Sequence, residues 1–197
     1  MKACLGSAAK TIEAEIDALS SLLPILDSIS GVCNMIAALP GKLVVTGMGK
    51  SGWIGQKISA TLRSTGQPSV FLDPAQALHG DMGMLAYGDG LLAISNSGET
   101  TECVAVARYA EAHAIPIVVI ASRADSELAR LAVHPIIYPL MPEGCPIQRA
   151  PMASAMQQLA LGDAIASELM AARGFTQADF LALHHGGYLG RVIAEAT

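Results

Sequence analysis

The stretch "VVTGMGKSGWIGQK", residues 44–57, decides the fold of this chain. A β-branched run meets a glycine-rich turn, and a helix-forming segment follows at once, which is typical of a buried strand leading into a helix. Gly47, Gly49 and Gly52 form the pattern G-x-G-x-x-G. Such a turn lies at the carboxyl end of its strand, where a helix N-terminus favours an anion. We therefore predict an anion site here.

Four further apolar runs alternate with helical patterns. The predicted strands are "KLVVTG", "PSVFLD", "GLLAIS", "IPIVVIA" and "VHPIIYP". The predicted helices after the first strand cover residues 52–64, 74–78, 101–113, 126–131, 153–173 and 176–183. Buried strands separated by helices form βαβ units with both sheet faces covered. We expect an α/β fold, a doubly wound five-stranded parallel sheet of flavodoxin-like or Rossmann-like type, as one domain over residues 1–197.

The segments that flank the sheet are predicted to be helical. Residues 8–38 carry apolar side chains at helical spacing, and Pro24 is expected to kink or split this N-terminal arm. At the other end, Gly174 follows the long helix as a plausible C′ glycine. The sheet is thus expected to lie between N- and C-terminal helices.

Composition excludes some partners. The net charge of −5 argues against nucleic acid, because phosphate binding normally needs a basic face. Mean hydropathy is high at +0.44, yet no apolar run approaches the roughly 18 residues that span a bilayer, so oligomerisation explains the hydropathy better. The N-terminus carries acidic residues on a helical pattern, unlike a signal peptide. We expect no membrane partner, a cytoplasmic location and reduced thiols at Cys4, Cys33, Cys103 and Cys145.

The first glycine loop allows three interpretations. Asp73 closes the second strand about 20 residues beyond Gly52, where a dinucleotide-binding fold has its ribose-binding acid. A Walker loop is rejected, because its first glycine would fall at Val44 inside the strand. The glycines could also simply permit a tight strand-to-helix turn.

The second loop, "SNSGETTE" at residues 95–102, favours a small anion. Ser95, Ser97 and Thr100 surround Gly98 just ahead of a helix, so hydroxyls and backbone N–H groups can converge on one phosphate. Alternatively, Thr100 could merely cap the helix. Capping alone leaves the paired serines unexplained.

These loops belong to a wider set of motifs. In order and spacing, "GMGKSGWIG", "HGDMGM", "AISNSGETTE", "EGCP" and "GGYLGR" closely resemble the sugar-isomerase (SIS) domain of bacterial arabinose-5-phosphate isomerases, over residues 41–191. The resemblance implies interconversion of D-arabinose 5-phosphate and D-ribulose 5-phosphate for 3-deoxy-D-manno-octulosonate (Kdo) synthesis, in lipopolysaccharide or capsule. Many members continue into a pair of cystathionine-synthase-type (CBS) modules; without them, we expect a stand-alone catalytic domain.

The resemblance also implies a catalytic set of Lys50, Glu102, Glu143 and His184. Moving a proton between C1 and C2 of the sugar needs a base and help for the enediolate oxyanion. We favour Glu143 as the base, in a loop free to face the site, against the alternative of a solvated loop glutamate. Lys50 would polarise the carbonyl or bind phosphate, and Glu102 would orient Lys50 or assist proton transfer. Ordinary helix-start roles stay open for both.

The histidines suit a different step, the opening of a cyclic sugar. His184 could exchange the proton near neutral pH, and in related SIS folds this histidine is delivered to the neighbouring subunit's site. His185 stands where the family usually has proline. His79 is either a second site histidine or structural. The segment "APMASA", residues 150–155, departs from the family's "APTSST" and lacks its threonine hydroxyls.

The predicted substrate- and phosphate-binding residues are Gly49, Ser51, His79, Ser95, Asn96, Ser97 and Thr100. We expect no cofactor. We also expect no metal, because the histidines show no i, i+4 pair with a carboxylate ligand set. The expected partners are a sugar phosphate and further copies of the chain, in a tetramer of two-fold-related dimers. A sugar-phosphate-sensing module without catalysis and a dinucleotide-binding enzyme are the competing functions.

Overall fold

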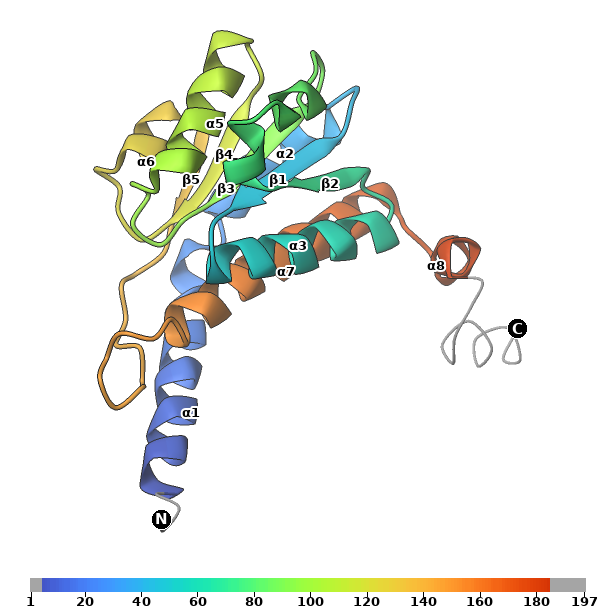
Figure 1. Ribbon diagram of the computed structural model, residues 1–197. Coiled ribbons are helices and arrows are strands. Elements are labelled where there is room, and N and C mark those ends of the chain that lie inside the picture. The colour runs from blue at the N-terminus through green and yellow to red at the C-terminus, as the bar shows by residue number, and fades with distance from the viewer. Residues whose placement is uncertain (1–4, 185–197) are drawn as a thin grey trace.

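The fold is a five-stranded parallel sheet between two helical layers, seen in a computed structural model that describes residues 5–184 (Figure 1). The strands are β1 (Leu43–Gly47), β2 (Ser69–Leu72), β3 (Gly90–Ile94), β4 (Ile117–Ala121) and β5 (His134–Ile137). Their order in the sheet is β2-β1-β3-β4-β5, and every pairing is parallel. This is the flavodoxin-like order, so the predicted fold class is confirmed.

The hydrophobic core consists of two clusters, one on each face of the sheet, because successive strand residues point to opposite faces. On one face, Val45 belongs to a buried cluster with Ile58 and Leu161. On the other, Val44 belongs to a cluster with Val106 and Leu128. The first face is covered by α2 (Ser28–Ala37), α3 (Lys50–Ser64) and α7 (Ala153–Arg173), and the second by α4 (Pro74–Ala77), α5 (Thr101–Ala112) and α6 (Glu127–Leu131).

The N-terminal arm is split at its proline. α1 (Leu5–Ser20) is followed by a 3-10 turn, η1 (Leu23–Ile25), before α2 begins. α1 extends away from the sheet (Figure 1), and Ile12, Ile16 and Leu23 are 56%, 56% and 69% exposed. Within residues 5–184 no single helix is long and apolar enough to cross a membrane, although Gly6–Ile25 and Ser28–Ala37, bent by 74°, pass that test together.

The C-terminal end also follows the sequence. α7 stops at Gly174, whose φ of 61° is left-handed, as a C′ glycine requires. α8 (Gln177–Leu183) starts with a capping box between Thr176 and Asp179. α8 follows the C-terminal end of α7, and the orange loop that precedes α7 lies at the opposite end of that helix (Figure 1). The second motif "HGDMGM" contains a 3-10 helix, η2 (Asp81–Met84), that the sequence patterns missed. His185 and "GGYLGR" lie outside the described residues.

The topology selects one place for a ligand. From β1 the chain moves outward to β2 and then returns to β3 on the other side of β1. The strand order therefore reverses between β1 and β3, and in open parallel sheets ligands bind beyond the carboxyl ends of strands at this switch point. The glycine loop after β1 and the serine loop after β3 both lie there.

Candidate active site

The serine loop after β3 is built around a hydroxyl pair. Ser95 Oγ and Thr100 Oγ1 are 2.9 Å apart, and the Gly98 N–H donates to Ser95 Oγ over 3.1 Å. Thr100 occupies the N-cap position of α5 but makes no capping hydrogen bond with its side chain. The capping interpretation of Thr100 is therefore wrong. A helix start without such a cap leaves first-turn N–H groups available to an anion.

Neighbouring residues hold this loop and leave one hydroxyl exposed. Ser97 is exposed, and its Oγ accepts the Glu99 N–H over 3.2 Å, so its own O–H can donate to a ligand. Gly98 has φ of 68°, and a Cβ there would collide with Ser126 Oγ. Glycine is thus required both by the backbone and by the close approach of the next loop.

Asn96 is held at its backbone and at its side chain. Its carbonyl accepts from Ser122 N at 3.0 Å and Ser122 Oγ at 2.7 Å. Its Oδ1 accepts the hydroxyl of buried Tyr138 over 2.9 Å. The residue faces a cavity of about 510 Å³, lined by Asn96, Leu140, Met141, Pro142, Glu143, Gln148 and Arg149. The loop after β3 therefore shares a cavity with the loop after β5.

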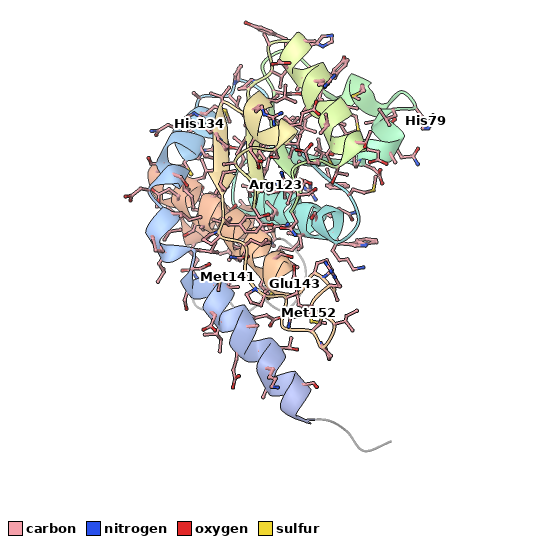
Figure 2. All side chains as sticks on the ribbon, turned by 90° about the vertical axis from the view of Figure 1, so that its left-hand side faces the viewer. His79, Arg123, His134, Met141, Glu143 and Met152 are labelled. Atoms are coloured by element: carbon pink, nitrogen blue, oxygen red, sulfur yellow. The ribbon has the colours of Figure 1, made fainter. Side chains whose placement is uncertain are left out.

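Glu143 is anchored to the start of α7. Its Oε2 accepts the N–H groups of Met152 at 2.7 Å and Ser154 at 3.2 Å, and its Oε1 accepts Ser154 Oγ at 2.5 Å. Figure 2 shows Glu143 beside Met152, where the loop meets the helix. Glu143 thus lines the cavity while the donors of the helix N-terminus fix its orientation, which disfavours the alternative of a solvated loop glutamate; its role as the base stays a prediction.

The arm supports this loop from the other side. Thr11 Oγ1 donates to the Gly144 carbonyl over 3.1 Å. Gly144 has φ of 71°, and a Cβ there would lie 2.8 Å from the Cβ of Ala14. Next to it, Cys145 Sγ accepts N–H groups from Arg149 at 3.2 Å and from Ala150 at 3.3 Å. The donation from Arg149, aided by those of Ala150 and its neighbours, holds the pKa of the Cys145 thiol below its ordinary value despite burial.

The glycine loop presents Lys50 at the start of α3. Gly49, with φ of 62°, occupies the N-cap position, and Lys50 and Ser51 form the first turn. Because β1 and β3 are neighbours, α3 and α5 begin at adjacent strand ends, so Lys50 and Glu102 lie on the same edge of the sheet. Among the described residues, neither forms an ion pair or a side-chain hydrogen bond. Orientation of Lys50 by Glu102 remains a prediction.

Asp73 has a structural role. Its carboxylate caps α4 by accepting the N–H groups of Ala75 at 2.9 Å and Gln76 at 3.4 Å. Aspartate commonly caps a helix in this way, by accepting N–H groups of the first turn. The acid on which the dinucleotide interpretation depends is therefore accounted for without a ribose.

The single chain does not bring the two predicted histidines to Glu143. His79 is exposed, and Figure 2 shows it well separated from Glu143. His184 ends α8, where its ring stacks on Phe180 with centroids 3.8 Å apart and Nδ1 lies 2.7 Å from the Phe180 carbonyl. Since α8 lies at the other end of α7 (Figure 1), His184 lies away from its own chain's cavity.

Sequence reasoning missed several residues at this edge: Ser122, Tyr138, Ser154 and Gln158. Tyr138 carried the clearest signal, because a tyrosine that ends a buried strand needs a partner for its hydroxyl. Within the described part of the chain, no group of three or more His, Cys, Asp or Glu side chains could hold a metal ion.

Comparison with known proteins identifies several similar sequences and structures. The chain is 46% identical to the arabinose 5-phosphate isomerase KdsD of Pseudomonas aeruginosa over 188 residues, which are 95% of this chain and 58% of that protein. It spans about half the length of the KdsD proteins that it matches in Escherichia coli and Shigella flexneri.

Two solved structures match over nearly their whole length. One is a protein of Escherichia coli CFT073 in complex with arabinose 5-phosphate, with a TM-score of 0.87 and 32% identity, covering 92% of this chain and 97% of that one. The other is a proposed phosphosugar isomerase involved in capsule formation in Bacteroides fragilis, with a TM-score of 0.88 and 34% identity, covering 93% and 98%. Residues 38–168 match the SIS domain. The chain therefore belongs to the SIS domain family.

Proposed function

We propose that this chain is an aldose–ketose isomerase that interconverts D-arabinose 5-phosphate and D-ribulose 5-phosphate through an enediolate, for Kdo synthesis. One observation carries the proposal. Asn96, in the hydroxyl loop at residues 95–100, lines the same cavity as Glu143, so the loop and the carboxylate lie at one edge of the sheet. A phosphate binder beside a fixed carboxylate is what this reaction needs. The relative bound to arabinose 5-phosphate and the KdsD proteins support this substrate.

In the proposed mechanism the phosphate lies on the serine loop. Hydroxyls of Ser95, Ser97 and Thr100 and the N-terminus of α5 hold the anion, with Gly49, Ser51 and His79 as further predicted contacts. This placement leaves C1 and C2 toward the cavity of Glu143.

The proton then moves between the two carbons. Glu143 removes the proton from C2 of the open-chain aldose, and the C2–H electron pair forms the enediolate as the carbonyl oxygen takes up charge. Lys50 stabilises that oxygen, with Glu102 beside it as an assisting group. Glu143 returns the proton to C1, and the proton of the C2 hydroxyl passes to the C1 oxygen, which gives the ketose.

The proposal includes an assembly, because His184 is remote from its own cavity. A neighbouring copy would supply His184 to open the sugar ring, in a homotetramer of two-fold-related dimers. The exposed apolar positions Ile12, Ile16 and Leu23 of the arm and of the turn that follows it support burial against another copy. The cytoplasmic location and the independence from metal and cofactor stay predictions.

The direct test is an isomerase assay. The purified chain is incubated with arabinose 5-phosphate and, in parallel, with other pentose and hexose phosphates, and ketose formation is followed. We expect turnover of arabinose 5-phosphate that survives treatment with a chelator. Turnover of only another sugar phosphate would contradict the substrate assignment.

The alternative is a sugar-phosphate-sensing module without catalysis. One observation favours it. A single chain supplies the hydroxyl groups of the proposed phosphate loop but does not bring His184 to its own cavity, so one chain could bind the phosphate without opening the sugar ring. Calorimetry, combined with the isomerase assay, separates the two functions. Binding of arabinose 5-phosphate in the calorimeter without ketose formation in the assay would support the sensing module.

A further inference from the structure

A buried chain of hydrogen bonds links α7 to the candidate site. Gln158 Nε2 donates to the Tyr138 hydroxyl over 2.9 Å, and that hydroxyl donates to Asn96 Oδ1 over 2.9 Å. Tyr138 is 0% exposed and Gln158 is 2% exposed. The three residues come from a helix, the segment just after β5 and the loop after β3. No step of the isomerase mechanism above uses Tyr138 or Gln158.

The direction of these bonds follows from the chemistry of the groups. The Gln158 amide nitrogen can only donate, so it occupies a lone pair of the Tyr138 oxygen. The phenol proton is then directed to Asn96, whose Oδ1 accepts it. Burial raises the pKa of Tyr138 to about 12, which keeps this proton in place at neutral pH.

The consequence concerns the other end of the Asn96 amide. With Oδ1 held by Tyr138 and the backbone carbonyl held by Ser122, Nδ2 is the side-chain donor that Asn96 can offer to the cavity it lines with Glu143. A donor fixed before the substrate arrives costs little reorganisation when charge develops on a substrate oxygen.

We infer that Tyr138 is a positioning residue: it fixes the amide of Asn96 so that Nδ2 donates to an oxygen of the sugar phosphate in the Glu143 cavity. This inference rests on the proposed isomerase function for its ligand. It adds a residue that makes no contact with substrate and acts only through Asn96. Without the hydroxyl the amide can rotate, and its carbonyl can then face the cavity.

The kinetic test is a double-mutant cycle. Tyr138→Phe keeps the ring and removes the hydroxyl, and we expect kcat/KM to fall about threefold to tenfold, the usual range for one lost hydrogen bond. In an Asn96→Ala background the same change should cause no further fall, because the group through which Tyr138 acts is absent. An equal fall in both backgrounds, or full activity of Tyr138→Phe, would overturn the inference.

A matched control separates positioning from general loss of stability. Ser69 is also buried, and its hydroxyl pairs with Ser59 Oγ at 2.9 Å near the start of β2, at the edge opposite to the candidate site. Ser69→Ala likewise loses a buried hydroxyl. We expect it to lower the melting temperature while leaving kcat/KM unchanged.

A second readout does not depend on catalysis. The side-chain amide signals of Asn96, identified in ¹H–¹⁵N spectra by their loss in Asn96→Asp, should shift in Tyr138→Phe and stay in place in Ser69→Ala. Unmoved signals in Tyr138→Phe would overturn the positioning role even if the enzyme is active. Shifted signals in a chain that binds arabinose 5-phosphate without turning it over would retain the positioning role and reject the isomerase proposal.

Discussion

Glu143 and Lys50 differ in how firmly the chain holds their side chains. Glu143 accepts three hydrogen bonds from the start of α7, whereas Lys50 is exposed and has no ion-pair partner in the part of the chain that the structure describes. A base must meet one carbon–hydrogen bond at a defined angle, so a fixed carboxylate suits it. A cation that stabilises a negative oxygen tolerates more freedom. The observed restraint therefore matches the proposed division of roles.

Replacement of Glu143 by glutamine tests the base. The amide keeps the size of the side chain, and Ser154 can accept from its NH₂ group by turning its hydroxyl, so the helix start is preserved. We expect kcat to fall by on the order of 10² or more with substrate binding largely kept. Steady-state kinetics, with a melting curve as the control for folding, decide this. A near-normal kcat would transfer the role to Glu102 or His184.

Replacement of Ser97 by alanine tests the phosphate loop. The exposed Ser97 hydroxyl can donate to an anion while its oxygen accepts the Glu99 N–H. Its loss should raise KM for the sugar phosphate, at a cost of about 0.5–3 kcal/mol, with a smaller effect on kcat. Inorganic phosphate should also inhibit Ser97→Ala less strongly than the unchanged protein. Unaltered KM and kcat would rule out this loop as the phosphate site.

At the scale of elements, hydrogen bonds join the loop after β3 to the loop after β4 and to α6. The Leu128 N–H donates to the Gly98 carbonyl over 3.1 Å, and Ser122 binds the Asn96 carbonyl. Gly98→Ala should therefore destabilise the protein and weaken phosphate binding together, because the new methyl group would meet Ser126 and the left-handed backbone would be strained. Gly80→Ala is the matched control: its φ of 123° is also unfavourable, yet its Cβ would meet no atom within 4 Å. Equal effects of the two changes on phosphate binding would contradict this coupling.

The opposite edge of the sheet carries a pH-dependent contact. Buried Asp89 accepts Lys42 Nζ at 2.6 Å, Lys42 N at 2.9 Å and Ala86 N at 3.0 Å. Burial alone would raise its pKa, but these donors and the Lys42 charge outweigh it and hold the pKa of Asp89 below its usual value.

A carboxylate with a lowered pKa stabilises the fold above its unfolded pKa of about 4, and this stabilisation is lost as the pH falls through the folded pKa. Asp89→Asn should cost about 1–3 kcal/mol of unfolding free energy at neutral pH, and the difference from the unchanged protein should shrink in acid. Denaturant titrations at several pH values measure this. A difference that grows in acid would contradict the sign.

The elements were predictable from the sequence to a greater degree than the contacts of the site. Strands are marked by local apolar runs, and the ends of α7 by local residues such as Gly174, so both were found. Tyr138, at the end of an apolar run, needs a partner for its hydroxyl, but that partner, Asn96, is 42 positions away, and nothing local identifies it. Likewise, the anchoring of Glu143 depends on how a loop folds back onto Ser154. The order of the motifs indicates Glu143 as a site residue, but the hydrogen bonds that fix its carboxylate are visible only in the structure.

At the scale of the whole molecule, the remote position of His184 has a direct test. Glu143→Gln subunits are mixed with His184→Ala subunits under conditions that allow exchange. If neighbouring chains complete each site, some mixed assemblies contain a site with both unchanged groups, and activity should reappear in proportion to the mixed species seen by native mass spectrometry. Mixed assemblies that form and remain inactive would show that His184 acts within its own chain or not in catalysis.

The two ends of α7 serve different places. Its first turn holds Glu143, and its last turn leads to α8 and His184. At a rise of 1.5 Å per residue, its 21 residues extend about 32 Å. Under the shared-site proposal the helix is therefore a spacer of fixed length between two catalytic centres. One inserted residue would lengthen it by about 1.5 Å and also swing its far end by about 100°. Changes in its length should therefore be tolerated far less than changes in its exposed side chains.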